Sequence, residues 1–177
     1  MKILKVILIV LLLIVAIPLV IALFVKKNYT VAREVTIDKP AGEVFDYIKH
    51  INNQSNYNKW VMMDPNMKKQ TKGTDGTVGY SLAWDSENKN VGKGEQEITQ
   101  ISEGKRIDLA IHFIRPFENS ATAYMTTNAV SPDQTKLTWA MTGKNPYPMN
   151  FMNLFMNTLL GKDLETSLAT LKGILER

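Results

Sequence analysis

Residues capable of acid–base or metal chemistry are few in this sequence of 177 residues. Glu95 and Glu97 stand two positions apart in an alternating segment, so their carboxylates share one face of a predicted strand. They could act as an acid–base pair, but an exposed strand face is the simpler interpretation. The two histidines, His50 and His112, fall in different predicted elements, which argues against a shared metal ion.

Nucleophile and phosphate-binding motifs are missing from the sequence. The chain has no cysteine, which excludes disulfides, thiolate metal ligands and thiol nucleophiles. It has no serine in a nucleophile-elbow motif, and the glycines of segment 73–79 are not followed by the Gly-Lys-Ser/Thr of a phosphate loop. Arg106, Asp108 and Arg115 are further charged residues, but nothing in their spacing selects them as a catalytic site. We therefore predict no metal and no cofactor and favour a protein without catalysis, although an enzyme stays open.

Large apolar side chains are better candidates, and the chemistry they favour is ligand binding. Alternation places such residues on one face of each of four predicted strands, and methionine and aromatic residues gather where a long C-terminal helix is expected to begin. The candidate ligand-binding residues are Trp60, Tyr80, Leu82, Trp84, Phe113, Met125, Trp139, Met141, Met152 and Phe155. Each could also be ordinary core, because methionine fills gaps in cores as well as lining adaptable binding surfaces.

The elements that must position these residues begin with seven predicted strands. Each is a short β-branched or alternating segment bounded by turn-forming residues. The segments are 29–37, 68–74, 78–85, 93–102, 106–113, 121–130 and 135–142. Their short polar connections favour antiparallel neighbours over parallel crossovers.

Helical patterns precede and follow the six later strands. Pro40 opens a helix with one apolar face, and the asparagine-rich segment 52–58 predicts a short second helix or a loop before Trp60. After Pro148 the apolar residues recur in steps of three or four, which predicts an amphipathic helix of roughly 27 residues with Gly161 as its weak point. We predict an α+β helix-grip fold, a seven-stranded antiparallel sheet wrapped around this helix.

One transmembrane helix is expected before that domain. Residues 6–25 are twenty consecutive apolar residues, which as a helix would span about 30 Å, the thickness of a hydrocarbon core. A cleaved signal peptide is the alternative, but its apolar core is typically only about 7–15 residues long, and residues 23–26 are poor cleavage residues. We therefore predict a membrane anchor with basic flanks over 1–27 and a domain over 28–177.

Charge and spacing limit what the domain can contact. The chain has 21 basic and 17 acidic residues, and four of the lysines lie in 1–27, so residues 28–177 are neutral. That balance gives no basic surface for nucleic acid, and we expect a monomer. Residues 26–28 reach only about 10 Å when extended, so the domain should sit against the lipid surface. Lysines flank both ends of the apolar segment, which leaves the side of the membrane open.

A diffuse pattern of aromatic, glycine and proline residues runs through residues 30–176. It comprises Lys39-Pro40, 43–48, Trp60, Gly79-Tyr80, Trp84, 91–94, Arg106-Ile107, Phe113, 116–118, Thr138-Trp139, Gly143, Leu154-Phe155 and 161–163. The pattern resembles the polyketide cyclase/dehydrase and lipid-transport branch of the SRPBCC, or START-like, superfamily. The resemblance implies a hydrophobic-ligand cavity between sheet and long helix, and only some members of the superfamily catalyse reactions.

Three functions follow as hypotheses from the residues and the resemblance together. The first is a single-pass, membrane-tethered domain that binds an apolar small molecule or lipid. The second is a cyclase- or dehydratase-like enzyme acting on a hydrophobic substrate in the same cavity. The third is a protein-interaction domain, for which a filled core and an exposed apolar patch would be expected.

Overall fold

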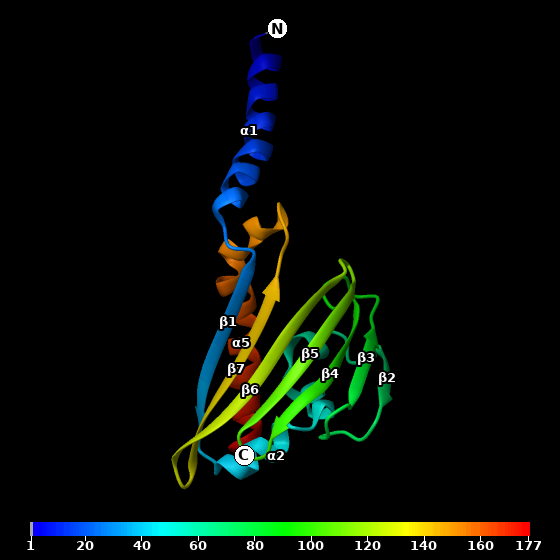
Figure 1. The fold of residues 1–177 in the computed structure, drawn as a ribbon, viewed down its shortest axis with the longest axis vertical. Helices are drawn as coiled ribbons and strands as arrows, with labels where there is room; N and C mark the ends of the chain where they lie inside the picture. The colour runs from blue at the N-terminus through cyan, green and yellow to red at the C-terminus, as the bar shows by residue number, and fades with distance from the viewer. Residues whose placement is uncertain (1) are drawn as a thin grey trace.

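The computed structural model describes residues 2–177 and shows a curved sheet around a long helix, with an apolar N-terminal helix projecting from one end (Figure 1). The elements are α1 (Lys2–Phe24), β1 (Asn28–Ile37), α2 (Ala41–Ile48), η1 (Ile51–Asn53), α3 (Gln54–Tyr57), α4 (Lys59–Met62), β2 (Lys68–Lys72), β3 (Ser81–Asp85), β4 (Lys93–Ser102), β5 (Arg106–Arg115), β6 (Asn119–Ser131), β7 (Gln134–Lys144), η2 (Met149–Met152) and α5 (Asn153–Leu175). The predicted helix-grip fold is confirmed.

The sheet has the order β1-β7-β6-β5-β4-β3-β2, and every neighbouring pair is antiparallel. Consecutive strands from β2 to β7 are neighbours, as their short turns predict, and β1 joins the sheet beside β7. β2 is an edge strand whose five residues are all exposed. The lysines at 68, 69 and 72 therefore lie on a solvated edge, a common protection against edge-to-edge pairing.

The core lies between the concave face of the sheet and α5. Leu164, Leu168 and Leu171 form the buried stripe of α5, and strand residues such as Ile37 and Ile107 pack in the same cluster. The stripe follows the period of 3.6 residues that the sequence shows, so one face of the helix is apolar. α2 packs against β6 and β7 at the end of the sheet away from α1 (Figure 1).

The long helix differs from its prediction in two places. Its first residues, Met149–Met152, form a 3-10 turn, and the α-helix begins at Asn153. A 3-10 turn has about 3.0 residues per turn, so the apolar spacing extrapolated from α5 does not hold there. Gly161, predicted as a weak point, is instead a contact site, because a side chain there would overlap the guanidinium of Arg33. Arg33 donates to Glu165 and to the carbonyl of Asn157, and so links β1 to α5.

α1 is long and apolar enough to cross a membrane, and its side chains are almost all exposed, unlike those of a core helix. Its C-terminal end is attached to the domain by two asparagines. Asn150 donates from Nδ2 to the carbonyls of Ala22 (2.6 Å) and Val25 (2.7 Å). Asn153 donates to the carbonyls of Lys26 (2.8 Å) and Lys27 (2.9 Å). One of the last carbonyls of α1, that of Ala22, which a helix cannot satisfy internally, thus has a partner in η2. The segment between α1 and β1 is held by η2 and α5.

Candidate ligand-binding cavity

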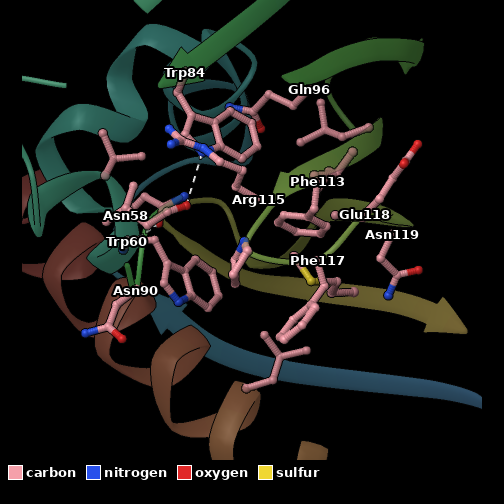
Figure 2. A pocket seen from close by; sticks show the side chains of 18 of the residues that line it. Asn58, Trp60, Trp84, Asn90, Gln96, Phe113, Arg115, Phe117, Glu118 and Asn119 are labelled. Carbon is pink, nitrogen blue, oxygen red and sulfur yellow. Dashed lines mark hydrogen bonds between the residues drawn. The ribbon is translucent and has the colours of Figure 1, made fainter. Parts of the chain in front are cut away.

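A cavity of about 570 Å³ lies between the concave face of the sheet, the first turns of α5 and the short helices α3 and α4. This volume is within the range of small-molecule sites, about 300–1,000 Å³. Apolar and aromatic side chains dominate its wall, and Figure 2 shows Trp60, Trp84, Phe113 and Phe117 around the hollow. The three tryptophans of the chain, Trp60, Trp84 and Trp139, all line it.

Strand register explains where the cavity ends inside the sheet. Leu109, Ala123 and Met141 lie side by side on β5, β6 and β7, and all three line the cavity. The next row toward the far end of the sheet contains Ile107, Met125 and Trp139, of which only Trp139 borders the hollow. That row forms the floor, where buried side chains fill the space between the sheet and the helices packed on it.

The aromatic wall on β3 and β5 depends on a glycine between them. Trp84 pairs with Gly94 of β4, which pairs with Phe113 of β5. A β-carbon on Gly94 would lie 2.6 Å from the Trp84 ring, so only glycine lets the indole lie over this strand. The Trp84 and Phe113 rings meet edge to face with centroids 6.2 Å apart, a favourable aromatic arrangement.

A buried group of amides interrupts the apolar wall. The side-chain oxygen of Gln54 accepts from Nδ2 of Asn58 and from Nε2 of Gln96, each at 3.1 Å. Among residues 2–177, Nε2 of Gln54 and Oε1 of Gln96 have no hydrogen-bond partner, although both side chains line the cavity. The indole N–H of Trp139 is also buried without a partner in this described range. The free amide groups of Gln54 and Gln96 are a donor and an acceptor for a ligand, whereas the buried indole N–H of Trp139 has no surface accessible from the cavity.

The short helices that cover the cavity are fixed to α5. The backbone N–H of Lys59 donates to Oγ of Ser167 at 3.0 Å, and the Lys59 ammonium pairs with Asp163. Asn58 caps α4 by accepting from the backbone N–H of Trp60 at 3.1 Å. These contacts place Trp60 and Asn58 over the cavity.

The mouth of the cavity lies at the end of the sheet nearest α1. It is lined by Tyr29 at the start of β1, Phe117 and Glu118 between β5 and β6, and Pro146 and Met149 after β7. Burial raises the pKa of Tyr29, so this phenol stays neutral at physiological pH. A β-carbon on Gly143 would overlap the Tyr29 ring, so the missing side chain at this glycine leaves space for the ring to pack against β7.

Charge near the cavity is confined to this mouth within the described part of the chain. Arg115 and Glu118 are the charged lining residues. Arg115 pairs with Asp85, which also accepts from Lys93 at 2.8 Å. The hydrogen bond from Lys93 keeps the pKa of Asp85 below its usual value, so the carboxylate stays ionised beside Arg115. The inner wall holds no ionised group in the described residues.

The structure brings together six of the ten predicted site residues. Those lining the cavity are Trp60, Leu82, Trp84, Phe113, Trp139 and Met141. Their role in binding a ligand stays a prediction.

The other four lie elsewhere, for reasons of depth or helix phase. Tyr80 is buried under η1 and donates its hydroxyl to Asn52, and Met125 is buried in the floor without bordering the hollow. Met152 falls in the 3-10 turn and is exposed. Phe155 stands one position before Met156, which lines the cavity, so it is rotated out and meets Phe151 edge to face.

Of the residues considered for acid–base or metal chemistry, only Arg115 lines the cavity. Glu95 and Glu97 are exposed on β4, as their alternation with buried residues predicts. Asp108 accepts two hydrogen bonds from Arg106, whose guanidinium lies over the Tyr124 ring. No group of three or more His, Asp or Glu residues that could hold a metal occurs between residues 2 and 177.

The buried amides are not among the residues predicted from the sequence. Gln96 alternates with Gly94 and Ile98 on the inward face of β4, and this was the available signal. Gln54 and Asn58 lie in the asparagine-rich segment, whose polar composition favoured a solvent-exposed loop. Nothing in that segment distinguishes its buried amides from its exposed ones.

Comparison with known families identifies one match over almost the whole domain. A family model described as polyketide cyclase / dehydrase and lipid transport matches residues 29–176. None of the curated proteins compared with the chain matches it. The matched residues include β1 from Tyr29 onward, the six other strands and all residues that line the cavity.

Solved structures share the fold at low sequence identity. A Mesorhizobium loti protein is 16% identical with a TM-score of 0.61, over 84% of this chain and 98% of that one. Norcoclaurine synthase from Thalictrum flavum, solved with dopamine and hydroxybenzaldehyde, is 9% identical with a TM-score of 0.63, over 84% and 86%. A Nitrosospira multiformis protein is 14% identical with a TM-score of 0.58, over 83% and 96%. At these identities the similarity shows the fold alone.

Proposed function

The chain belongs to the polyketide cyclase/dehydrase and lipid-transport family, and from that premise we propose that it is a membrane-tethered binding protein for a hydrophobic small molecule or lipid. The observation that carries the proposal is the cavity, which has about 570 Å³ of space behind a mostly apolar wall. A protein interior is normally packed without voids of this size. A molecule with a large apolar part is the occupant that such a wall stabilises best.

The buried part of the ligand is uncharged. An ionised group on the inner wall would lose its hydration without finding a counter-charge, which is strongly unfavourable. A hydroxyl, ester or carbonyl group could instead bond with the free amide groups of Gln54 and Gln96. The ligand class is therefore a neutral or weakly polar lipid, and any charged head group would stay at the mouth near Arg115.

Membrane tethering is supported by the attachment of α1 to the domain. A signal peptide that is removed has no need to be bound by the mature protein. Here Ala22 is buried, and Asn150 is buried with both of its side-chain hydrogen bonds directed to the C-terminal end of α1 and the residue after it. We therefore propose that residues 1–27 remain as an anchor and that residues 28–177 are a single monomeric binding domain.

An enzyme is the second candidate, favoured by the similarity of fold to norcoclaurine synthase. Catalysis would need an acid or base at the substrate. Among the described residues, the polar groups of the inner wall are amides and indoles, which do not titrate. The titratable lining residues, Tyr29, Arg115 and Glu118, lie at the mouth. Binding without chemistry agrees better with this wall.

Tryptophan fluorescence of the full-length protein tests the proposal, since all three indoles line the cavity. The protein is reconstituted in vesicles of phosphatidylcholine and phosphatidylglycerol. A short-chain diacylglycerol that carries bromine on one acyl chain is added, because bromine quenches indoles on contact. We expect saturable quenching beyond that given by a brominated phosphatidylcholine, which accounts for contact with the bilayer.

Ala123→Phe supplies the matching variant. Ala123 lines the cavity between Leu109 and Met141, so a phenyl ring there fills the space and should abolish most of the saturable quenching. Ala110→Phe, on the exposed face of the neighbouring strand, is the control and should quench like the wild type. Equal quenching of wild type and Ala123→Phe would contradict a ligand in this cavity.

A further inference from the structure

We infer that the mouth of the cavity is held against the bilayer by α1 and η2, so that ligand moves between the leaflet and the cavity without crossing water. This inference rests on the proposed function and adds to it a source for the ligand and a route of exchange. Its partner is the lipid surface adjoining the anchor.

Strand direction places the mouth at the anchored end. β1 starts directly after α1, and its first residue, Asn28, pairs with Lys144 at the end of β7. The connections that line the mouth, between β5 and β6 and after β7, therefore lie at the same end of the sheet as α1. The turn between β6 and β7 and the C-terminus lie at the opposite end (Figure 1).

An exposed apolar rim surrounds the mouth. The rim consists of Phe117, Tyr147, Met149, Met152 and Phe155, with exposures from 39% for Met152 to 75% for Phe117. Exposed apolar clusters of this kind mark interaction surfaces, and aromatic residues are favoured where protein meets the membrane interface. Two rim residues, Phe117 and Met149, also line the cavity, so the rim and the cavity wall are one continuous apolar surface.

The attachment of α1 beside the rim indicates that a lipid surface covers the rim. α1 ends at Phe24, and Asn150, one position after Met149 of the rim, donates to carbonyls of Ala22 and Val25. The rim is therefore attached to the last turn of the apolar helix, where a bilayer would end. Lys26, Lys27 and Lys144 are exposed at this end without an ion pair among the described residues. Their ammonium groups would favour an anionic lipid surface.

A fluorescent label reports directly whether the rim meets lipid. The chain has no cysteine, so Phe117→Cys carries the only thiol and can be labelled with an environment-sensitive nitrobenzoxadiazole group. In full-length protein in vesicles we expect blue-shifted emission that spin-labelled lipids quench. Asp133→Cys, in the turn between β6 and β7, is the control and should report water.

Exchange kinetics test the route. Tyr147→Asp/Met152→Asp places charge on rim residues that do not line the cavity. We expect brominated diacylglycerol to quench the tryptophans roughly tenfold more slowly or slower still, because two apolar contacts with the leaflet are lost, and to reach the wild-type end point. Val78→Asp/Val130→Asp, at exposed valines away from the mouth, should load at the wild-type rate.

The two measurements separate this inference from the proposed function. If quenching is saturable but the label at position 117 reports water and the rim variant loads at the wild-type rate, the leaflet route is wrong and ligand binding stands. If a partner protein covers the rim instead, the label reports water in vesicles, and the inference is overturned in the same way. If no saturable quenching occurs, the proposed function fails, whatever the label shows.

Discussion

Three glycines set the positions of large side chains around the site. A β-carbon on Gly94 would overlap Trp84, one on Gly143 would overlap Tyr29, and one on Gly161 would overlap Arg33. None of the three requires a left-handed backbone. Their role is to leave room, so that an aromatic ring or a guanidinium can pack flat against the backbone of the neighbouring element.

At the residue scale, truncation of Trp139 distinguishes a binding cavity from ordinary packed core. Its indole packs edge to face on Tyr57, with centroids 6.1 Å apart, and its N–H is buried without a partner among the described residues. Truncating a packed core aromatic costs about 3–5 kcal/mol. We expect Trp139→Ala to cost less, because part of the ring borders open space and an unsatisfied donor is removed with it.

Urea unfolding of the full-length protein in detergent micelles, followed by circular dichroism, measures this loss. Phe45→Ala is the reference, since Phe45 is 1% exposed in the packed core beneath the sheet and does not line the cavity. An equal loss of stability in both variants would mean that Trp139 belongs to plain core. The same Trp139→Ala protein should also bind the brominated diacylglycerol more weakly.

At the scale of helices, a buried side chain joins two elements that are distant in sequence. Asn150 in η2 is 1% exposed and donates both of its side-chain hydrogen bonds to the last turn of α1 and to Val25 just after it. The joint is short and buried, so α1 and the domain have a defined relative position. This joint is what allows an apolar helix to orient the mouth of a cavity.

Asn150→Asp is expected to open this joint. The change replaces the amide donor by a carboxylate oxygen that faces two carbonyl oxygens, and each buried group left unsatisfied costs about 1–3 kcal/mol. Because Asn153 then holds Lys26 and Lys27 alone, trypsin should cut after these lysines faster than in the wild type. Gel analysis of cleavage over time measures the effect, with Asn128→Asp on the exposed face of β6 as control. Unchanged cleavage would show that the bonds of Asn150 do not hold α1.

At the scale of the whole molecule, an elongated apolar helix is attached to a neutral domain with an open cavity. Residues 28–177 carry no net charge to attract nucleic acid, and the exposed apolar rim lies at the end that meets α1. A cavity fixed beside a membrane can take up molecules of low solubility without a diffusing carrier. The arrangement fits local uptake or sensing of a lipid.

We expect the full-length chain to stay with membranes after extraction with alkaline carbonate, and a chain of residues 28–177 to be soluble and monomeric. The continuous apolar stretch of α1 and the neutral domain are the physical reasons. Immunoblotting of the fractions and sequencing of the mature N-terminus measure the outcome. A soluble protein that begins after the apolar stretch would identify α1 as a removed signal peptide. Protease added to intact cells then reports on which side of the membrane the domain lies.

Local periodicity was enough to predict most of the fold. Strand alternation, helical spacing and turn residues are set by backbone geometry within a few residues, so all seven strands, α2 and α5 could be located from the chain alone. The exposed positions of Glu95 and Glu97 follow from the same alternation. The family resemblance also follows from sequence, because it depends on residue types at regular intervals.

Only the tertiary structure decided which inward-facing residues border empty space. Met125 and Met141 alternate identically on neighbouring strands, yet the row of Met125 is filled by packed side chains and the row of Met141 borders a hollow. The amide pair of Gln54 and Gln96 joins segments 42 residues apart, and Asn150 reaches back to α1 across more than a hundred residues. Such contacts depend on sheet curvature and helix placement, which are sums over the whole chain and leave no local pattern.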